Sequence, residues 1–351
     1  MREDSRTVPK HFCKPQIVCI IMSNFYEDWL TLWDKNVEER RRARKVIHWD
    51  ELNWVRTRQD AKSALAVAPE TGFKTNGGIT MLAEIPVGWM TGRHSHGEEA
   101  IFIIQGKGSS IVNGKQYDWG ESSCIRIPFG AIHQHFNTGD APVRYYSALV
   151  PHLENFISVG RFVQEEDCGE YKRLPETKAP VTDHDETGRR IVLRKQDAGV
   201  GHHGEHKNHP KDAFHESFAR EMDTVQHAKI QRMMGNFPDF IGDEVEITDI
   251  FYDKPQWQSE KHAHMEAILH ILQGEGYSIV DGENIPWKTG TTFHIQGPQT
   301  VHQHFNTSDM ECQQLRTHFG IRKYYQPIVK DKFPYTYYEA GRPLERIRER
   351  A

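Results

Sequence analysis

The chain has 351 residues, 37% of them hydrophobic and 11% aromatic, a composition typical of a folded globular protein. Its length allows two domains, each with a hydrophobic core of its own. The formal net charge of -5, from 44 basic and 49 acidic residues, excludes a protein that binds nucleic acid through a strongly basic overall charge.

Apolar runs and cysteines indicate the compartment. The longest apolar run near the start, Ile17 to Met22, is too short to cross a bilayer, and no small-residue cleavage site follows it. The cysteines are odd in number and form no CxxC pair, which fits packing residues in a reducing compartment. They are Cys13, Cys19, Cys124, Cys168 and Cys312. We therefore expect a cytoplasmic protein with neither a membrane nor a nucleic acid among its partners.

Residues 1–60 are predicted to form an N-terminal arm. Apolar residues recur at helical spacing between residues 24 and 45, and a charged run follows them. We expect an amphipathic helix that packs on a barrel or on a neighbouring subunit, and its aromatic residues Trp29 and Trp33 favour a homo-oligomer. The natural protein starts either with a short ordered arm before this helix or at Met22, where the helix signal opens.

Residues 61–165 consist of short apolar segments separated by turn signals. Ile101 to Ile104 is a continuous apolar run that a glycine soon follows, and Asn113-Gly114 is a strong hairpin signal. Short strands at hairpin spacing predict an all-β barrel or sandwich.

A charged segment, residues 166–227, breaks this pattern and is rich in proline and histidine. We interpret it as a solvated linker, with a partly helical stretch from residue 213 to 233. Metal binding by its histidines is the alternative, because histidine-rich tracts can bind metal.

The pattern of the first barrel returns between residues 228 and 335, and a basic tail, residues 336–351, closes the chain. The hairpin signal Asn113-Gly114 has its counterpart in Asp281-Gly282, and Trp119 has its counterpart in Trp287 at the same offset along the chain. A repeat at this level of detail predicts two copies of one barrel.

Two clusters of histidine and glutamate dominate the repeat. The run His94 to Glu99 reads HSHGEE, and the run His262 to Glu266 reads HAHME. The second run follows the first at the same offset as the two hairpin signals. Further along, His133 has its counterpart in His302, with the offset longer by a single position.

These residue types predict two metal sites. Alternate residues of a strand face the same side, so both histidines and the following glutamate of each cluster are expected to point one way. A later strand supplies a third histidine to each site. The predicted metal ligands are His94, His96, Glu98, His133, His262, His264, Glu266 and His302.

The choice of glutamate in the first cluster rests on the repeat. Glu99 is an alternative to Glu98, but Glu266 aligns with Glu98 and Ala267 aligns with Glu99. Three imidazoles and one carboxylate suit Fe(II), Mn(II), Ni(II) or Zn(II). Buried histidines that serve only as hydrogen-bonding core residues are the alternative, which the repetition of the whole set disfavours.

These motifs resemble the two-part signature of the cupin superfamily, in which HxH and a glutamate precede P-x-G-x-x-H-x-x-x-N. Residues 128–137 match the second part fully, whereas Gly297-Pro298 departs from P-x-G in the second copy. The resemblance implies an all-β bicupin, with two tandem double-stranded β-helix (jelly-roll) barrels and an N-terminal helical arm.

Within the bicupins, the chain resembles the gentisate and salicylate 1,2-dioxygenases, in which a second histidine lines the substrate site in an H-x-H-x-N run. His135 and His304 occupy that position here, and His135 is the predicted acid-base residue. The resemblance implies an Fe(II)-dependent, extradiol-type dioxygenase that uses O₂ to cleave a hydroxylated, carboxylated aromatic ring.

Two departures from that group bear on the site. Ile101 and Phe102 occupy the region where those enzymes have an arginine for the substrate carboxylate, so Arg126 is our candidate to replace it, with Arg56, Arg58 and Arg93 as others. Those enzymes also use three histidines without glutamate. The alternatives are therefore a Mn-dependent bicupin of the oxalate decarboxylase or oxidase kind and a non-enzymatic metal-binding bicupin.

Overall fold

The structure is a computed structural model that describes residues 24–177, 183–202, 229–319, 321, 336–339 and 342–344. The chain divides into two compact units, Met1–Arg42 and Ala43–Ala351. No helix in the described ranges combines the length and the apolar character that crossing a lipid bilayer requires.

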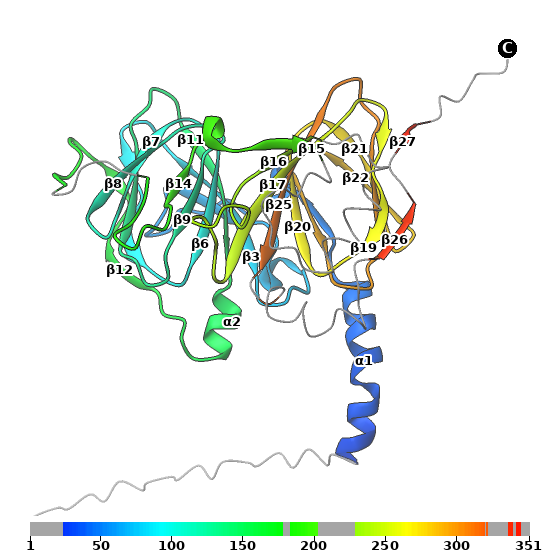
Figure 1. The fold of residues 1–351 in the computed structure, drawn as a ribbon. Helices are drawn as coiled ribbons and strands as arrows, with labels where there is room; N and C mark the ends of the chain where they lie inside the picture. The colour runs from blue at the N-terminus through cyan, green and yellow to red at the C-terminus, as the bar shows by residue number, and fades with distance from the viewer. Residues whose placement is uncertain are drawn as a thin grey trace, which may run out of the picture. The chain divides into compact units, whose positions relative to one another are not determined.

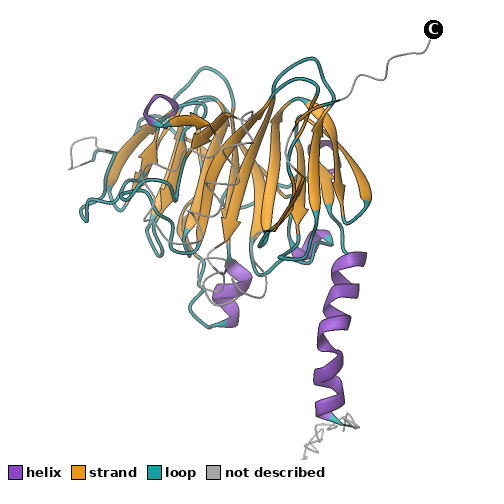
Figure 2. Cartoon of the chain, turned by 45° about the vertical axis from the view of Figure 1, so that its right-hand side comes forward, coloured by secondary structure: helices purple, strands orange, loops and turns teal. Residues whose placement is uncertain are grey.

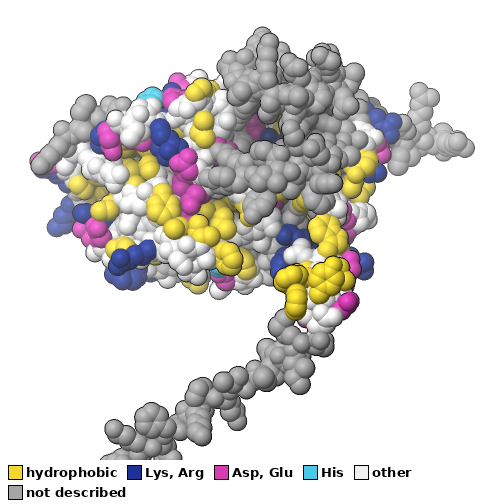
Figure 3. All heavy atoms as spheres, turned by 60° about the horizontal axis from the view of Figure 1, so that its bottom comes forward, with side chains coloured by type: hydrophobic (Ala, Val, Ile, Leu, Met, Phe, Trp, Pro, Cys, Tyr) yellow, Lys and Arg dark blue, Asp and Glu magenta, His cyan; other side chains and the backbone are white. Residues whose placement is uncertain are grey.

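The first unit contributes helix α1 (Phe25–Arg42), which confirms the helix predicted near the N-terminus. The Oδ1 atom of Asn24 caps the helix by accepting a hydrogen bond from the backbone N–H of Tyr26. Every residue of α1 is described and none is buried, and hydrophobic side chains are exposed along the helix (Figure 3). This exposure agrees with the idea of subunit association, which stays a prediction.

The first barrel, barrel 1, consists of two antiparallel sheets, and its strands lie on the left in Figure 1. One sheet contains, in order of pairing, β14 (Val192–Leu193), β9 (Cys124–Ile127), β6 (Glu99–Gln105), β11 (Val143–Leu149), β3 (Ile79–Ile85) and β2 (Lys62–Leu65). The other contains β12 (Val163–Glu166), β5 (Arg93–Ser95), β10 (His133–Asn137), β4 (Trp89–Met90) and β13 (Gly169–Glu170), together with the hairpin β7 (Gly108–Val112) and β8 (Lys115–Trp119) beside β10.

The second barrel, barrel 2, repeats this arrangement (Figures 1 and 2). One sheet contains β1 (Val46–His48), β23 (Thr291–Ile295), β20 (Ala267–Gln273), β25 (Cys312–Phe319), β17 (Val245–Asp253), β16 (Lys229–Arg232) and β15 (Val200–His202). The other contains β22 (Glu283–Lys288), β21 (Glu275–Val280), β24 (His302–Asn306), β18 (Trp257–Gln258) and β27 (Arg342–Pro343), with β19 (Lys261–Ala263) between β24 and β26 (Thr336–Glu339).

Short helices complete the described chain. Helix α2 (Pro151–Phe156) follows β11, and the 3₁₀ helices are η1 (Trp49–Glu51), η2 (Pro69–Thr71) and η3 (Lys195–Asp197). The predicted all-β architecture with one long N-terminal helix is confirmed.

Strand β6 shows why a continuous apolar run occurs in the middle of barrel 1. Ile101 and Ile103 pack inside barrel 1, whereas Phe102, on the opposite face of the strand, packs in a core shared with barrel 2. A strand buried on both faces needs apolar residues at every position. The shared core includes Leu82, Tyr146, Ile247, Ile250, Ile268, Leu315 and Phe319.

The structure extends the barrels beyond the predicted domain boundaries. Residues 46–48 of the predicted arm form β1, which pairs with β23 of barrel 2. Residues 336–339, predicted as tail, pair with β19 of the same barrel. The open edge of a sheet accepts a further strand, because its backbone N–H and C=O groups need partners.

Part of the predicted linker contributes strands as well. β12, β13 and β14 add to the sheets of barrel 1, and β15 adds to barrel 2. Most of the histidine-rich stretch, residues 203–228, lies outside the described residues. Residues 229–232 form strand β16, so the helical part predicted between residues 213 and 233 does not include them.

Candidate metal centres

The first histidine cluster assembles where strand β10 runs beside β5. His133 pairs directly with His94, and His96 follows at the end of β5. The ligand atoms of the three imidazoles lie within 4.8 Å of one another, and all three residues are buried. We name these three residues cluster 1.

The hydrogen bonds of cluster 1 leave one nitrogen of each ring available. The Nδ1 atoms of His94, His96 and His133 lie 2.8, 2.9 and 2.8 Å from backbone carbonyl oxygens. Because a carbonyl only accepts, each Nδ1 carries the proton and each Nε2 carries a lone pair. None of the three Nε2 atoms has a hydrogen-bond partner among the described residues. Buried imidazole lone pairs of this kind fit a bound metal ion.

Burial also keeps these imidazoles neutral. It lowers the pKa of His96 to about 3 and that of His133 well below its usual range, and the neighbouring histidines add to both shifts. Neutral imidazole is the form that binds metal.

Glu99 supplies the carboxylate of this site. Its Oε2 atom lies 3.5 Å from His96 Nε2 and 3.7 Å from His133 Nε2, and no described residue forms a hydrogen bond with it. Its other oxygen accepts a hydrogen bond from the Ser147 hydroxyl. Burial raises the pKa of Glu99 to about 8, which a cation beside the carboxylate would oppose.

The expectation that Glu98 faces cluster 1 is wrong. Its Oε2 atom accepts hydrogen bonds of 2.6 Å from each of the backbone N–H groups of Asp243 and Glu244 in barrel 2. Strand β5 ends at Ser95 and β6 begins at Glu99, so the alternation of a continuous strand does not extend to Glu98.

Arg126, our candidate for the substrate arginine, lies apart from the histidines. It is buried, with its guanidinium 3.5 Å from Glu98 and 3.0 Å from Asp185. Ile125 and Ile127, on either side of Arg126 in β9, pack inside barrel 1, so the Arg126 side chain lies on the opposite face of the strand. This placement outside the barrel interior contradicts a role for Arg126 in contacting substrate.

Cluster 2 consists of His262, His264 and His302, whose ligand atoms also lie within 4.8 Å of one another. Strands β19 and β24 bring them together by pairing His262 with His302. All three Nδ1 atoms contact backbone carbonyl oxygens, at 3.1, 2.6 and 2.9 Å respectively. The Nε2 atom of His302 has no partner among the described residues, and burial lowers the pKa of its ring to about 4.

Glu266 does not join cluster 2, so the prediction for this residue is wrong as well. Its Oε1 atom lies 2.7 Å from His294 Nε2 and accepts a hydrogen bond of 3.0 Å from the backbone N–H of Asn76. Glu99 is the first residue of β6 in barrel 1, and Ala267 is the first residue of the matching strand β20 in barrel 2. Barrel 2 therefore has an alanine where barrel 1 has its carboxylate. Cluster 2 is therefore a three-histidine set.

An arginine replaces a serine in the same part of barrel 2. The partner of Ile101 across the sheet is Ser147, and the partner of the corresponding Leu269 is Arg316. Barrel 1 thus presents Glu99 and Ser147 where barrel 2 presents Ala267 and Arg316. Arg316 is not among the site residues predicted from the sequence, because the single-residue change in repeat spacing between the clusters conceals its match with Ser147.

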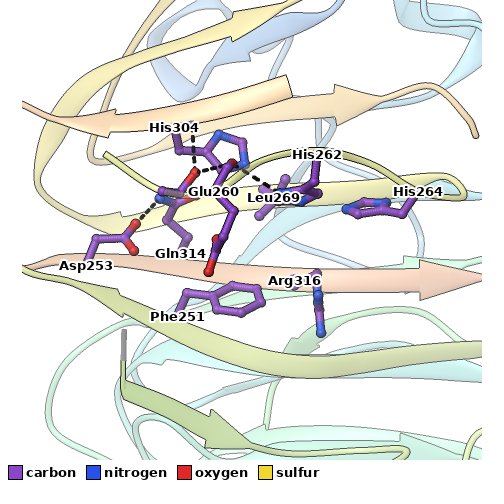
Figure 4. A pocket seen from close by; sticks show the side chains of 10 residues that line it. Phe251, Asp253, Glu260, His262, His264, Leu269, His304, Gln314 and Arg316 are labelled. Atoms are coloured by element: carbon purple, nitrogen blue, oxygen red, sulfur yellow. Dashed lines mark hydrogen bonds between the residues drawn. The ribbon is translucent and has the colours of Figure 1, made fainter. Parts of the chain in front are cut away.

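A cavity lies beside cluster 2 (Figure 4). His262, His264 and Arg316 line it, with Glu260 and His304 completing much of its polar wall. Its volume is about 40 Å³, whereas the corresponding interior of barrel 1, near His135, is filled. Barrel 2 therefore offers space beside cluster 2, whereas the matching pocket next to His135 in barrel 1 has no room for a water molecule.

The guanidinium of Arg316 is oriented by two neighbours in barrel 2. It forms an ion pair with the buried carboxylate of Asp249, and its Nε donates to the Thr248 hydroxyl at 3.3 Å. The guanidinium also lies over the ring of Phe251, 4.5 Å from its centroid. Two of five N–H groups are used in this way, and others remain for a ligand.

The second histidine of each H-x-H-x-N run is held by the same pair of residues, a serine and a tryptophan, in both barrels. The Ser110 hydroxyl lies 2.6 Å from His135 Nδ1 and accepts a hydrogen bond of 2.8 Å from the indole N–H of Trp119. In barrel 2, His304, Ser278 and Trp287 repeat these contacts at 2.8 and 2.9 Å. His135 faces a filled interior, whereas His304 lines the cavity.

Comparison with known proteins agrees with this geometry. Residues 81–149 match the sequence model of a cupin domain. No curated protein sequence matches the chain significantly.

Solved structures share the fold over most of the chain. Salicylate 1,2-dioxygenase from Pseudaminobacter salicylatoxidans matches 79% of this chain and 80% of its own length, at 13% identity and a TM-score of 0.54. A variant of that enzyme in complex with gentisate matches 93% of this chain and 97% of its own, at 13% identity and a TM-score of 0.57. A variant of Bacillus subtilis oxalate decarboxylase matches 78% and 77%, at 11% identity and a TM-score of 0.58.

This chain has the bicupin fold. The predicted arrangement of two tandem cupin barrels is thereby confirmed, and the similar structures are those of enzymes that act on small molecules. At these identities the likeness shows the fold alone, because one fold hosts many different reactions.

Proposed function

We propose that this protein is a metal-dependent dioxygenase that cleaves the ring of a hydroxylated, carboxylated aromatic compound in barrel 2. The observation that supports it is the cavity in which His262, His264 and Arg316 meet. A three-histidine centre without carboxylate, with a histidine of the H-x-H-x-N run beside it, is the arrangement of the gentisate-type enzymes that the sequence resembles.

Cluster 2 fits a metal ion by its chemistry. His262, His264 and His302 supply three imidazole nitrogens and no carboxylate, a set that Fe(II) accepts, with Mn(II), Ni(II) and Zn(II) as alternatives. Bound Fe(II) would supply Lewis-acid and O₂ chemistry at this position.

The remaining residues of the cavity have separate roles in the proposal. Arg316 binds the substrate carboxylate through the N–H groups that Asp249 and Thr248 leave unused. His304 is placed to hold or move a proton of the substrate hydroxyl, because Ser278 fixes its ring at the cavity wall. Leu269 and Phe251 supply apolar surface for a flat ring. The cavity of about 40 Å³ has room for only a few waters, so it has to widen when the ring enters.

Metal analysis and O₂ uptake test this proposal. Purified protein should contain iron and consume O₂ with a salicylate- or gentisate-like compound, and His262→Ala should abolish this uptake. Replacement of the exposed His152 by alanine is the control and should leave uptake unchanged. Metal-bearing protein that consumes no O₂ across such a panel contradicts the reaction. Loss of uptake in His94→Ala but not in His262→Ala contradicts the choice of barrel.

A second candidate reaction follows from cluster 1. Its three histidines and Glu99 form the mixed set that suits Mn(II), which favours a Mn-dependent bicupin of the oxalate decarboxylase or oxidase kind. Release of CO₂ from oxalate without net O₂ uptake, lost in Glu99→Gln, would favour this reaction over ring cleavage.

A further inference from the structure

One buried glutamate of each barrel reaches into the other barrel. Glu98 of barrel 1 accepts hydrogen bonds from the backbone N–H groups of Asp243 and Glu244, both at 2.6 Å, and lies 3.4 Å from that of Val245. Glu266 of barrel 2 accepts a hydrogen bond of 3.0 Å from the backbone N–H of Asn76. Both contacts join the two barrels.

The two contacts are equivalent under the internal repeat. Glu266 occupies in the second copy the position that Glu98 occupies in the first, and Glu244 corresponds to Asn76 at the same offset along the chain. Glu98 therefore binds a segment of barrel 2, and Glu266 binds the matching segment of barrel 1.

A basic side chain supports each glutamate from the same place in the sheet. Arg126, opposite Ala100, lies 3.5 Å from Glu98, and His294, opposite Ile268, lies 2.7 Å from Glu266. These two basic residues are also related by the offset that relates the glutamates. Three pairs of residues related by the repeat thus form the two contacts: Glu98 and Glu266, Asn76 and Glu244, and Arg126 and His294.

The first of these contacts is also reciprocal at the backbone. The N–H group of Glu98 donates to the Glu244 side chain at 3.1 Å, so both the backbone and the carboxylate of Glu98 are held by barrel 2. Charge-assisted hydrogen bonds in a buried site are strong and directional. The side chain of Glu98 is 1% exposed, so water does not compete for these bonds.

Each glutamate is next to the metal-binding residues in the chain. Glu98 lies between His96 and Glu99, whose imidazole and carboxylate face each other in cluster 1, and Glu266 follows His264 of cluster 2 by two positions. Residues bonded in sequence cannot move independently, so the anchor at Glu98 limits the positions of both neighbours.

We propose that Glu98 and Glu266 form a reciprocal clamp by which each barrel positions the metal-binding loop of the other. They are positioning residues and not metal ligands. The clamp couples the two centres. The segment around Glu244 in barrel 2 fixes the loop that follows His96 in barrel 1, and the segment around Asn76 in barrel 1 fixes the loop that follows His264 in barrel 2. This inference rests on metal binding by the clusters, which the proposed function includes, but is independent of the reaction.

Co(II) binding tests the clamp with the full-length chain. A parent variant with His262→Ala and His264→Ala retains cluster 1 alone, and its affinity for Co(II) is measured by calorimetry. Adding Glu244→Ala, a change in barrel 2, should weaken Co(II) binding at cluster 1 by about tenfold, the usual scale for residues that orient metal ligands. It should also change the visible absorption bands of bound Co(II), which a merely stabilising contact would leave alone.

A matched control and a second variant complete the test. Glu275→Ala removes an exposed glutamate of barrel 2 and should change neither affinity nor spectrum. Glu244→Ala removes the carboxylate that accepts from the Glu98 N–H, and Glu98→Gln alters the carboxylate that accepts from the backbone of barrel 2. Glu98→Gln should therefore also weaken Co(II) binding.

Two outcomes overturn the clamp. Folded Glu244→Ala and Glu98→Gln variants that bind Co(II) within about twofold of the parent, with unchanged spectra, show that the contact does not position the centre. A parent that binds no Co(II), although folded, contradicts metal binding by cluster 1 and removes the function of the clamp. The first outcome leaves the proposed reaction in barrel 2 untouched, whereas a failure of O₂ uptake leaves the clamp untouched.

Discussion

Glu98 and Glu99 are neighbours in sequence with opposite surroundings. Glu99 faces His96 and His133, and Glu98 faces the backbone of barrel 2. The repeat correctly indicated that Glu98 and Glu266 are equivalent, but the shared feature is a contact between barrels and not a metal ligand. Residue type and spacing could not separate these roles, because a buried carboxylate satisfies either one.

Ionisation of Asp253 makes the free energy of unfolding depend on pH. It is buried beside the cavity, where its carboxylate accepts a hydrogen bond of 2.6 Å from Gln314, and burial raises its pKa from 3.8 to about 7, with Glu260 adding to the shift. Its contribution to stability is present below about pH 4 and is lost as the pH rises through about 7, because the folded state holds the proton more tightly than the unfolded state.

We therefore predict that Asp253→Asn flattens the pH dependence of the free energy of unfolding between about pH 4 and 8. The difference from the natural protein should grow with pH to at most about 4 kcal/mol. Denaturant unfolding at a series of pH values measures it, with a change at the exposed Asp140, Asp140→Asn, as control. Parallel pH curves for Asp253→Asn and the natural protein would show that this carboxyl ionises normally in the folded state.

At the scale of elements, the turns were the most predictable features. Asn113-Gly114 joins β7 to β8 and Asp281-Gly282 joins β21 to β22, and all four residues have positive φ. Such hairpins depend on local backbone preferences alone. Strand β1, in contrast, could not be assigned from sequence, since its partner strand, which contains Phe293, lies near the other end of the chain.

Packing around η1 yields a prediction about the attachment of β1. A Cβ atom on Gly290 would clash with the ring of Trp49, and the glycine's φ of +88° is already unfavourable for alanine. Gly282 has a φ of +83° but open space around it. Gly290→Ala should lower the free energy of unfolding by about 2–4 kcal/mol and Gly282→Ala by only about 1 kcal/mol.

Thermal or denaturant unfolding of the two glycine variants checks this difference. Because both glycines share the left-handed backbone conformation, the excess cost of Gly290→Ala isolates the clash with Trp49. Equal losses in the two variants would mean that η1 and β1 do not pack against this turn.

On the scale of the whole molecule, the two barrels share one core, and this predicts that their stabilities are linked. Leu315 and Ile271 are both fully buried in barrel 2, but Leu315 belongs to the shared core and Ile271 to the core of barrel 2 alone. Leu315→Ala should destabilise the protein by about 2–5 kcal/mol and speed amide hydrogen exchange in β6 and β11 of barrel 1.

Ile271→Ala is the matched control for this prediction. It should destabilise barrel 2 by a similar amount while changing exchange in β6 and β11 less, when both are followed by mass spectrometry. The same protection of barrel 1 in both variants would show that the shared core does not transmit stability between the barrels.

The sequence by itself determined the all-β class, the two-fold repeat, the hairpins and the six histidines of the two clusters. These features depend on short-range periodicity, and a repeat preserves them in both copies. Only the tertiary structure decided which carboxylate faces which cluster, that Arg126 is held by Glu98 and Asp185, and that Arg316 lines the cavity. Those outcomes depend on strand breaks and on contacts between distant segments, which periodicity does not encode.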